Sequence, residues 1–443
     1  MTTGTIFAPA TSATPAGIAV IKISGPAARA ALERLAQRPA PEPRVATRVR
    51  LSDRNGETID DGLAIWFPAP RSFTGEDVAE LHVHGGRAVV SALLDALSDC
   101  PGLEPAEPGA FSRRAFENGK FDLTAAEGLA DLVAAETEAQ RRQALRQMHG
   151  DLGRLYESWR SRLLDALAHL EATIDFSDED LPENLETDVA TQVNTVRGEI
   201  DTHLDDGHRG ERLRDGMHLA IVGPPNAGKS SLLNRLARRD AAIVSDIAGT
   251  TRDVIEVHLD LGGYPVVVSD TAGLREADGE IEREGVRRAR SRAAEADVRV
   301  AVFDGAVWPG VDGTTREIMD DDTIAVVNKC DLGRVSPPVA IDGHRAYAVS
   351  ALTGEGIESL MTALAGIVRD RFTGDGGPAL TRVRHRTALE DCAAALRRYG
   401  RSTSIELAAE ELRLATRALG RVTGRVDVED MLDVIFCDFC IGK

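Results

Sequence analysis

The sequence predicts a multidomain chain: an N-terminal α+β domain, a helical domain, and a P-loop α/β domain inserted into the helical one. Three observations predict it. At 443 residues the chain is too long for one ordinary core. Strand-like runs alternate with helical segments over residues 214–371, and helical pattern lies on both sides of that region. The expected domains are 1–118 (α+β), 119–213 (helical, first part), 214–371 (α/β) and 372–443 (helical, second part).

The elements follow from apolar periodicity and from the turn residues between them. In the first domain, apolar runs at 18–23, 63–67 and 78–84 each precede Gly or Pro and are expected to be strands. Apolar residues recur every three or four positions over 152–170, which predicts a long helix, and the acidic stretch 175–188 interrupts this pattern. In the α/β domain, Gly262-Gly263 predicts a hairpin turn. The strands expected there are 218–222, 256–261, 264–269, 299–303, 323–327 and 346–349.

Composition restricts the class of protein. No apolar stretch is long enough to span a bilayer, and residues 1–10 lack a secretion signal, so we expect a cytoplasmic chain with no membrane contact. The five cysteines form no CxxC pair, which fits a reducing compartment. A net charge of -19 argues against a general nucleic-acid coat, and the basic clusters at 141–162 and 382–401 are typical of solvated helix faces.

A phosphate-binding loop is the clearest motif. Residues 223–230, Gly-Pro-Pro-Asn-Ala-Gly-Lys-Ser, match the P-loop pattern and lie between an apolar strand and a helical run. Glycines let backbone N–H groups point at the β-phosphate, the helix N-terminus favours negative charge, and Lys229 reaches the β- and γ-phosphates. Ser230 is then expected to bind magnesium.

Two further motifs follow strands and complete a guanine-nucleotide site. Asp270 begins an Asp-Thr-Ala-Gly segment that places a carboxylate at a strand end, where it holds magnesium through water, while Gly273 offers its N–H to the γ-phosphate. In Asn-Lys-Cys-Asp at 328–331, Asp331 can accept from guanine N1–H and the exocyclic amine, a donor pair that adenine lacks. Residues 350–352, Ser-Ala-Leu, provide a backbone N–H for guanine O6.

A switch segment and a missing residue refine the site. Residues 249–253, Gly-Thr-Thr-Arg-Asp, are expected to order when GTP binds, with Thr251 completing the magnesium shell. In Ras-like enzymes a glutamine after the Asp-Thr-Ala-Gly segment orients the attacking water, but here that position is Leu274. The acidic residues that follow are the candidates for this role: Glu276, Glu280, Glu282 and Glu284.

At this point the chain resembles the MnmE, or TrmE, family of tRNA modification GTPases over essentially its whole length. The resemblance depends on the P-loop with its internal Pro-Asn, on residues 246–253 and 270–275, on Ser-Phe-Thr-Gly-Glu-Asp at 72–77, and on the terminal Phe-Cys-Ile-Gly-Lys at 439–443. It implies a homodimer joined through a folate-binding N-terminal domain, with a Ras-like G domain inserted in the helical domain.

The resemblance also implies a chemistry. Two G domains meet when GTP and potassium are bound, and potassium replaces an arginine finger at Asn226, Ser245, Ile247 and Thr250. Glu282 matches the water-orienting acid. The family acts with a flavoprotein partner, MnmG, which carries FAD and joins it in a heterotetramer. Together they install an aminomethyl-type group at carbon 5 of a tRNA wobble uridine, taking the one-carbon unit from 5,10-methylenetetrahydrofolate or a formyl-tetrahydrofolate.

Two sets of site residues result. The folate residues carry over as Lys22, Glu80, Lys120 and Lys443, and Cys440 as a residue with a catalytic role beside the folate. Lys22 stands where the family usually has arginine, so a point charge replaces a bidentate fork. Ser245 stands where threonine is common. The residues expected to bind GTP are Asn226, Ala227, Gly228, Lys229, Ser230, Ser231, Ser245, Asp246, Ile247, Ala248, Gly249, Thr250, Thr251, Asp270, Thr271, Ala272, Gly273, Asn328, Lys329, Asp331, Ser350, Ala351 and Leu352.

Alternatives remain open at three places. Glu80, His82 and His84 alternate along a strand and would form a metal site if a fourth ligand converged. Cys440 stands four from the end as in a prenylation box, but this resemblance is superficial, because Gly442 and Lys443 are poor at the last two places and the preceding residues are acidic where a membrane anchor favours basic ones. The alternative reading of the tail is a frayed, functionless end. The whole chain could also be a ribosome-assembly or translational GTPase switch, which would be expected to carry a basic RNA-binding module.

Overall fold

The computed structural model falls into two compact units, neither of them continuous in sequence. The first contains 1–130, 147–193 and 394–443, and the second contains 131–146 and 194–393. In the described part of the chain no helix is both long and apolar enough to cross a membrane. The described residues are 4–11, 15–175, 185–237, 256–270, 296–335, 339–373 and 377–426, with Leu432, Asp433, Ile435, Phe436, Phe439 and Gly442 of the C-terminal tail.

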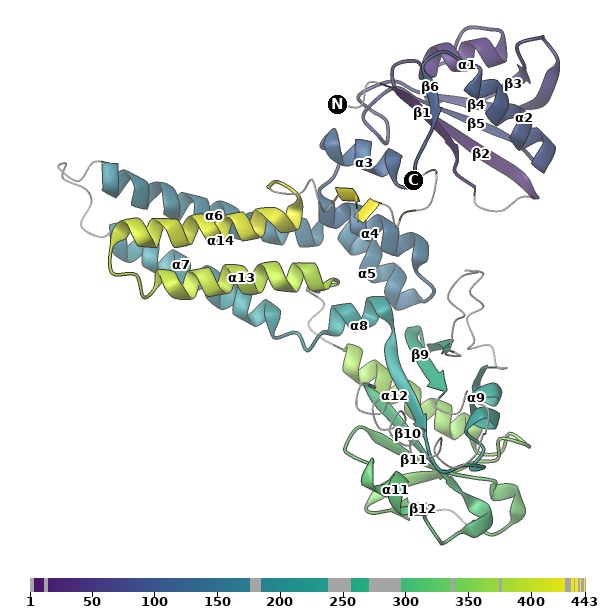
Figure 1. Ribbon diagram of the computed structural model, residues 1–443, viewed down its shortest axis with the longest axis vertical. Helices are drawn as coiled ribbons and strands as arrows, with labels where there is room; N and C mark the ends of the chain where they lie inside the picture. The colour runs from purple at the N-terminus through teal and green to yellow at the C-terminus, as the bar shows by residue number, and fades with distance from the viewer. Residues whose placement is uncertain are drawn as a thin grey trace, which may run out of the picture. The chain divides into compact units, whose positions relative to one another are not determined.

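The first unit is built around a six-stranded sheet with the order β3-β4-β5-β2-β1-β6 (Figure 1). All neighbouring strands are antiparallel except β1 and β6. Alternate residues such as Ile21, Ile23, Leu81 and Val83 are buried under α1 and α2, as period-2 patterning requires. The elements are β1 (Thr5–Pro9), β2 (Ala16–Ser24), α1 (Ala28–Ala36), β3 (Thr47–Ser52), β4 (Thr58–Phe67), β5 (Val78–Gly85), α2 (Arg87–Ser98), β6 (Leu103–Pro105) and α3 (Ala110–Glu117).

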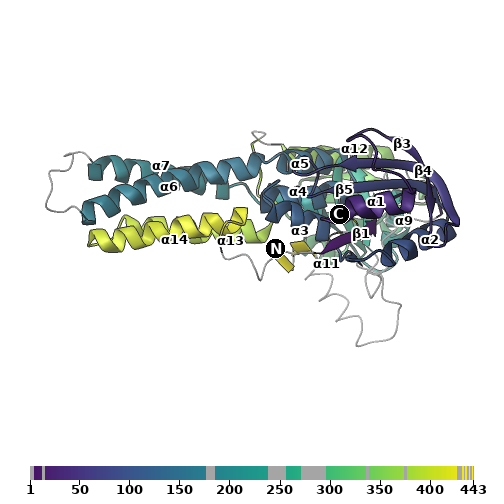
Figure 2. The ribbon, with the colours of Figure 1, turned by 90° about the horizontal axis from the view of Figure 1, so that it is seen from above.

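Long helices complete the first unit and continue into the second. The periodic run at 152–170 forms α6 (Asp151–Asp175), which confirms the predicted helix, and Figure 2 shows α6 and α14 (Ile405–Thr423) side by side. Gly424, at φ +82, ends α14 in the left-handed conformation that favours glycine. The other helices are α4 (Leu123–Ala134), α5 (Glu138–Met148), α7 (Leu185–Leu204) and α13 (Val383–Tyr399).

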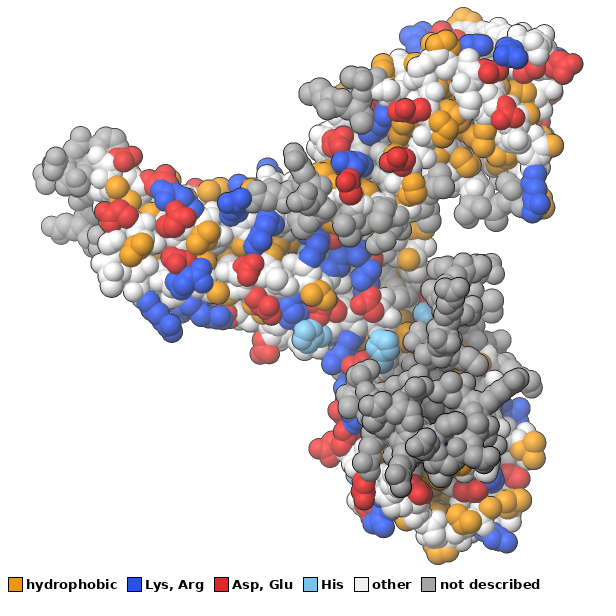
Figure 3. Space-filling model, viewed as in Figure 1, with side chains coloured by type: hydrophobic (Ala, Val, Ile, Leu, Met, Phe, Trp, Pro, Cys, Tyr) orange, Lys and Arg blue, Asp and Glu red, His pale blue; other side chains and the backbone are white. Residues whose placement is uncertain are grey.

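Basic side chains on these helices are matched by carboxylates. Figure 3 shows Lys and Arg interspersed with Asp and Glu over this surface, and arginines of both basic clusters form ion pairs: Arg141–Glu138 (2.7 Å), Arg160–Glu157 (3.3 Å) and Arg398–Glu411 (2.9 Å). The basic clusters at 141–162 and 382–401 therefore lie on mixed-charge helix faces.

The second unit contains a seven-stranded sheet with the order β12-β13-β11-β10-β7-β9-β8. Its central strands are parallel, and the edge strands β8 and β12 are antiparallel to their neighbours. Both faces of the central strands are buried, as expected for a doubly wound domain. The elements are α8 (Arg209–Asp215), β7 (Met217–Val222), α9 (Lys229–Ala237), β8 (Glu256–Leu261), β9 (Tyr264–Asp270), β10 (Val298–Asp304), α11 (Gly313–Glu317), β11 (Thr323–Asn328), β12 (Val339–Ile341), β13 (His344–Ala348) and α12 (Ile357–Phe372).

Residues 131–146 belong to the second unit although they lie far from its sheet in sequence. The side-chain amide of Gln140 donates to the carbonyl of Arg214 at 3.0 Å, and His258 Nδ1 lies 3.2 Å from Glu136 Oε2. The start of α5 is thereby fixed to α8 and to the β8–β9 hairpin.

Candidate functional site

The P-loop joins the end of β7 to the start of α9, and no other residue type fits at its two glycines. At Gly223, φ is +154, and a Cβ would lie 2.3 Å from the carbonyl oxygen of Val302. At Gly228, φ is +91, and a Cβ would lie 2.2 Å from Asn328 Nδ2. The close approach of other backbone and side-chain atoms therefore requires glycine at both places. Asn226 adopts φ +62, a conformation that asparagine tolerates better than most residues.

The first turn of α9 presents polar groups beside this loop. Lys229 Nζ donates to the carbonyl oxygens of Gly223 and Pro224, each at 2.9 Å, so the ammonium group spans the loop. Ser230 and Ser231 follow with exposed side chains. An ammonium group, hydroxyls and the N-terminus of a helix together suit the oxygens of a polyphosphate.

Asn328 ties together three segments of the site. Its side chain is 2 % exposed, its Nδ2 donates to the carbonyl of Ala227 at 2.8 Å, and its Oδ1 accepts from the N–H of Ala351 at 3.0 Å. These two contacts brace the loop that Asn328 begins. The P-loop and the loop after β13 are held at a fixed spacing by one buried amide.

Lys329 and Asp331 follow on the same loop. Lys329 has φ +64, and its Nζ lies 2.7 Å from Asp304 Oδ2 at the end of β10. Burial opposes ionisation of Asp304, but hydrogen bonds from Lys329 and from the N–H of Ala306 outweigh it and lower the pKa of this carboxyl. Asp331 remains exposed, so its carboxylate is open to a donor pair from outside.

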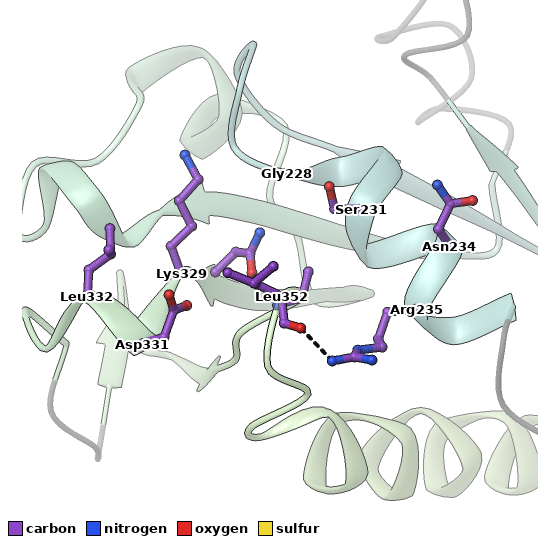
Figure 4. Close-up of a pocket in the computed structure, with 10 residues that line it drawn as sticks. Gly228, Ser231, Asn234, Arg235, Lys329, Asp331, Leu332 and Leu352 are labelled. Atoms are coloured by element: carbon purple, nitrogen blue, oxygen red, sulfur yellow. Dashed lines mark hydrogen bonds between the residues drawn. The ribbon is translucent and has the colours of Figure 1, made fainter.

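These loops enclose a cavity of about 520 Å³ (Figure 4). Three of its lining residues, Asn234, Arg235 and Leu332, were not predicted. The first two lie three and four residues beyond Ser231 on α9, and that spacing places them on the same helix face. The cavity is lined by Gly228, Ser231, Asn234, Arg235, Asn328, Lys329, Asp331, Leu332, Ala351 and Leu352.

Part of the predicted site lies outside the described residues. Asp270 ends β9, and its backbone pairs with Ile221 just before the P-loop, but its side chain is not among the described ones. The remaining predicted GTP, magnesium, potassium and catalytic positions of this domain outside the described residues are Ser245, Asp246, Ile247, Ala248, Gly249, Thr250, Thr251, Thr271, Ala272, Gly273 and Glu282.

A second group of predicted residues gathers in the first unit. Lys22 on β2 and Glu80 on β5 are direct cross-strand partners. Lys22 Nζ lies 5.5 Å from the ring centre of Phe73, a cation–π contact. Lys120 Nζ donates to the carbonyl of Pro70 at 3.0 Å, which places it beside the same loop.

Polar residues that the sequence did not single out hold that loop. Ser24 Oγ lies 2.7 Å from Thr74 Oγ1 and donates to Glu76 Oε2 at 2.9 Å. Arg114, only 4 % exposed, donates to the same Glu76 oxygen at 3.0 Å and to the Ser24 carbonyl at 3.2 Å. Thr74 and Glu76 of the 72–77 motif therefore fix the loop, while Phe73 stays 40 % exposed at the site.

The C-terminal tail reaches the same region. A Cβ at Gly442, where φ is +92, would lie 2.2 Å from the carbonyl of Pro9. Pro9 follows Ala8 on β1, and Ala8 pairs with Lys22 on β2. Gly442 of the tail therefore lies against β1, beside the strand that carries Lys22. Cys440 and Lys443 lie outside the described residues.

The alternating Glu80, His82 and His84 do not converge on one point. His82 Nε2 faces Glu80 Oε2 at 3.4 Å, whereas His84 Nδ1 lies 2.9 Å from Asp60 Oδ1. Among the side chains that the structure describes, no group of three or more His, Cys, Asp or Glu is placed to hold a metal ion.

A doubly wound sheet with a P-loop after β7 and an Asn-Lys-x-Asp loop after β11 defines a P-loop GTPase of the guanine-nucleotide-binding class. Family profiles agree: "GTP-binding protein TrmE N-terminus" matches residues 5–120 and "MnmE helical domain" matches residues 123–440. The chain belongs to the MnmE (TrmE) family of tRNA modification GTPases.

Relatives cover the full length. The tRNA modification GTPase MnmE of Paramagnetospirillum magneticum is 60% identical over 439 residues, 99% of each chain. That of Rhodospirillum rubrum is 59% identical over 459 residues, 100% of each chain. Among solved structures, the G domain of the T. maritima FeoB iron transporter is 23% identical and covers 34% of this chain and 98% of that one. Its TM-score of 0.24 gives the likeness no weight for function.

Proposed function

We propose that this GTPase uses its nucleotide cycle to drive modification of tRNA at carbon 5 of the wobble uridine. It acts in the cytoplasm as a homodimer, in a heterotetramer with the FAD-carrying flavoprotein MnmG. The product is an aminomethyl or carboxymethylaminomethyl uridine, and the one-carbon unit comes from a tetrahydrofolate. Family membership favours this function over a ribosome-assembly or translational switch.

The observation that carries the proposal is the convergence in the first unit. Lys22 lies over the Phe73 ring and pairs across the strands with Glu80, and Lys120 bonds to Pro70 of the same loop. Gly442 of the tail lies against β1, the strand that pairs with β2. These groups suit a folate: a carboxylate can accept from the amino and ring N–H donors of the pterin, and ammonium groups can meet the carboxylates of the tail. Cys440 and Lys443 would enter the same region from the tail.

The nucleotide site suits the proposed ions. The exposed Ser230 hydroxyl at the start of α9 is a hard oxygen ligand of the kind magnesium prefers, with Thr251 as its second protein ligand. Asn226, exposed on the P-loop, would hold potassium with Ser245, Ile247 and Thr250. These ions would offset charge that develops between the phosphates.

Glu282 would orient the attacking water, because Leu274 cannot. Two measurements test this part. Replacing potassium by sodium should slow GTP hydrolysis sharply, and equal rates would remove Asn226 from its role. Glu282→Ala should reduce the hydrolysis rate while GTP affinity is kept, so a normal rate would return the assignment to the neighbouring acids.

Mass analysis of tRNA nucleosides tests the function itself. Cells lacking this chain should lose the carbon-5 modified uridine, and the full-length chain should restore it. Glu80→Gln should fail to restore it while the purified variant hydrolyses GTP normally. Asp95→Asn on the exposed face of α2 is the matched control and should restore it fully. Unchanged nucleosides in the deletion strain would refute the proposed function.

A further inference from the structure

Arg235 makes a contact that the nucleotide motifs do not explain. It lies on α9, and its Nη2 donates to the carbonyl oxygen of Leu352 at 2.7 Å (Figure 4). Leu352 belongs to the loop after β13 that is expected to read the guanine base. The contact therefore links the helix that follows the P-loop to the base-reading loop, and both residues line the cavity.

The loop beyond Val349 is compact but carries an exposed tip. Ser350 N–H donates to the Glu355 carbonyl at 2.9 Å, and Gly354 N–H donates to the Ser350 carbonyl at 2.8 Å. The Leu352 side chain is 81 % exposed and so contributes little packing to hold the tip. Hydrogen bonds therefore hold the tip, both within the loop, where the Thr353 N–H donates to Ser350 Oγ at 3.0 Å, and from other elements.

Side chains from two other elements supply such bonds. Asn328 accepts from the N–H of Ala351, and Arg235 donates to the carbonyl of Leu352. The loop also approaches the guanidinium closely: a Cβ at Gly354 would lie 3.1 Å from Arg235 Nη2. Asn328 fixes the tip from the side of β11, and Arg235 fixes it from the side of α9.

We propose that Arg235 is a positioning residue that holds residues 350–354 in their base-binding conformation and thereby slows release of guanine nucleotide. A loop ordered before binding loses less conformational entropy when the base binds, and this gain appears mainly in the dissociation rate. The hydrogen bond of Arg235 goes to the base-reading loop and not to the P-loop, so its loss should alter nucleotide release more than the hydrolysis step. The inference rests on the assignment of this cavity to guanine.

The test is release of a fluorescent GDP analogue from the full-length protein, chased with excess GDP in a stopped-flow instrument. Arg235→Ala should release it roughly three to ten times faster, the effect expected for the net loss of one ordinary intramolecular hydrogen bond. Arg235→Lys retains one donor group, and its rate of release should lie between those of the wild type and Arg235→Ala. Arg369→Ala removes an exposed charge from α12, where Arg369 Nε lies 3.6 Å from Oδ1 of its neighbour Asp370, and should release GDP at the wild-type rate.

Single-turnover hydrolysis at saturating GTP separates positioning from a general structural role. The rate at which Arg235→Ala hydrolyses bound GTP should change less than its rate of GDP release. Release at the wild-type rate by Arg235→Ala, or a lowered melting temperature with unchanged release, would overturn the proposal. Asp331→Asn tests separately whether the cavity binds guanine. If that variant keeps its preference for GTP, the guanine assignment is wrong, and this failure is distinct from a failure of the Arg235 proposal.

Discussion

Ala139 donates its backbone N–H to the carbonyl oxygen of Gly263 at 3.0 Å, so the start of α5 is bonded to the turn of the β8–β9 hairpin. The hairpin lies between the two segments expected to sense the γ-phosphate, because β8 begins at Glu256 after Thr251 and β9 ends at Asp270 before Gly273. The hairpin therefore connects these two segments to the first turn of α5.

Gly263→Ala should loosen this junction. Gly263 adopts φ +91, where an L-residue is strained by about 1–2 kcal/mol, although the nearest atom to an added Cβ, Glu138 Cβ, is 3.9 Å away. We expect hydrogen exchange of the Ala139 amide to rise roughly five- to thirtyfold. Gly366→Ala, at an open position inside α12, should instead raise the melting temperature. Unchanged exchange at Ala139 in the first variant would contradict the argument.

Gly228→Ala should weaken nucleotide binding. The added Cβ would lie 2.2 Å from Asn328 Nδ2, and Asn328 cannot retreat without breaking its bonds to Ala227 and Ala351. Loss of those bonds and the left-handed strain together predict a fall in affinity of at least about tenfold, measured by titration with a fluorescent GTP analogue. Gly313→Ala, where nothing lies within 4 Å, is the control. Affinities within twofold of each other would show that the P-loop can relax.

Local patterns predicted the elements that follow simple periodicity. The expected strand 256–261 is β8 without change, Gly262-Gly263 is its hairpin turn, and 152–170 lies within α6. The prediction did not include β12, whose three residues, Val339–Ile341, are too few to show a pattern and form a strand only because they pair with β13.

Residues that act through distant partners could not be predicted. Arg114 is buried against Glu76 and Ser24, which are far from it in sequence, and nothing in its local sequence distinguishes it from a surface arginine. Arg235 lies one helical turn beyond the P-loop serines, yet its partner is a backbone carbonyl of another loop. Backbone carbonyls leave no trace in residue identity, so such contacts require coordinates.

Asp331→Asn should change base preference. The carboxylate is exposed at the cavity and is expected to accept two guanine N–H donors, whereas an amide presents one donor and one acceptor. Replacement leaves a mismatch with guanine that is worth about 2–4 kcal/mol and matches xanthine better. Steady-state hydrolysis of GTP and xanthosine triphosphate checks this, and undiminished GTP turnover would refute the role of Asp331.

His203 should make the stability of the second unit sensitive to mild acid. It lies near the end of α7, and the charges of Asp206, Arg386 and His385 act on it. Burial lowers its pKa from 6.5 to about 4, although Asp206 opposes the shift. Arg386 in turn donates to Asp206 at 2.7 Å and to the Leu204 carbonyl at 2.9 Å. These two bonds fix the charged groups at the C-terminal end of α7.

The sign of the effect follows from proton uptake. Because the folded pKa of His203 is below the unfolded one, the unfolded state binds more protons between pH 6.5 and 4, and stability falls as pH drops through that window. At pH 5.5 the loss from this residue is about 1 kcal/mol relative to pH 7.5. His203→Gln cannot titrate, so denaturant unfolding at the two pH values should show a smaller loss in the variant. Titrating groups that do not interact with His203 are common to both proteins and cancel in this comparison. An equal pH-dependent loss in both would mean that His203 remains solvated in the folded chain.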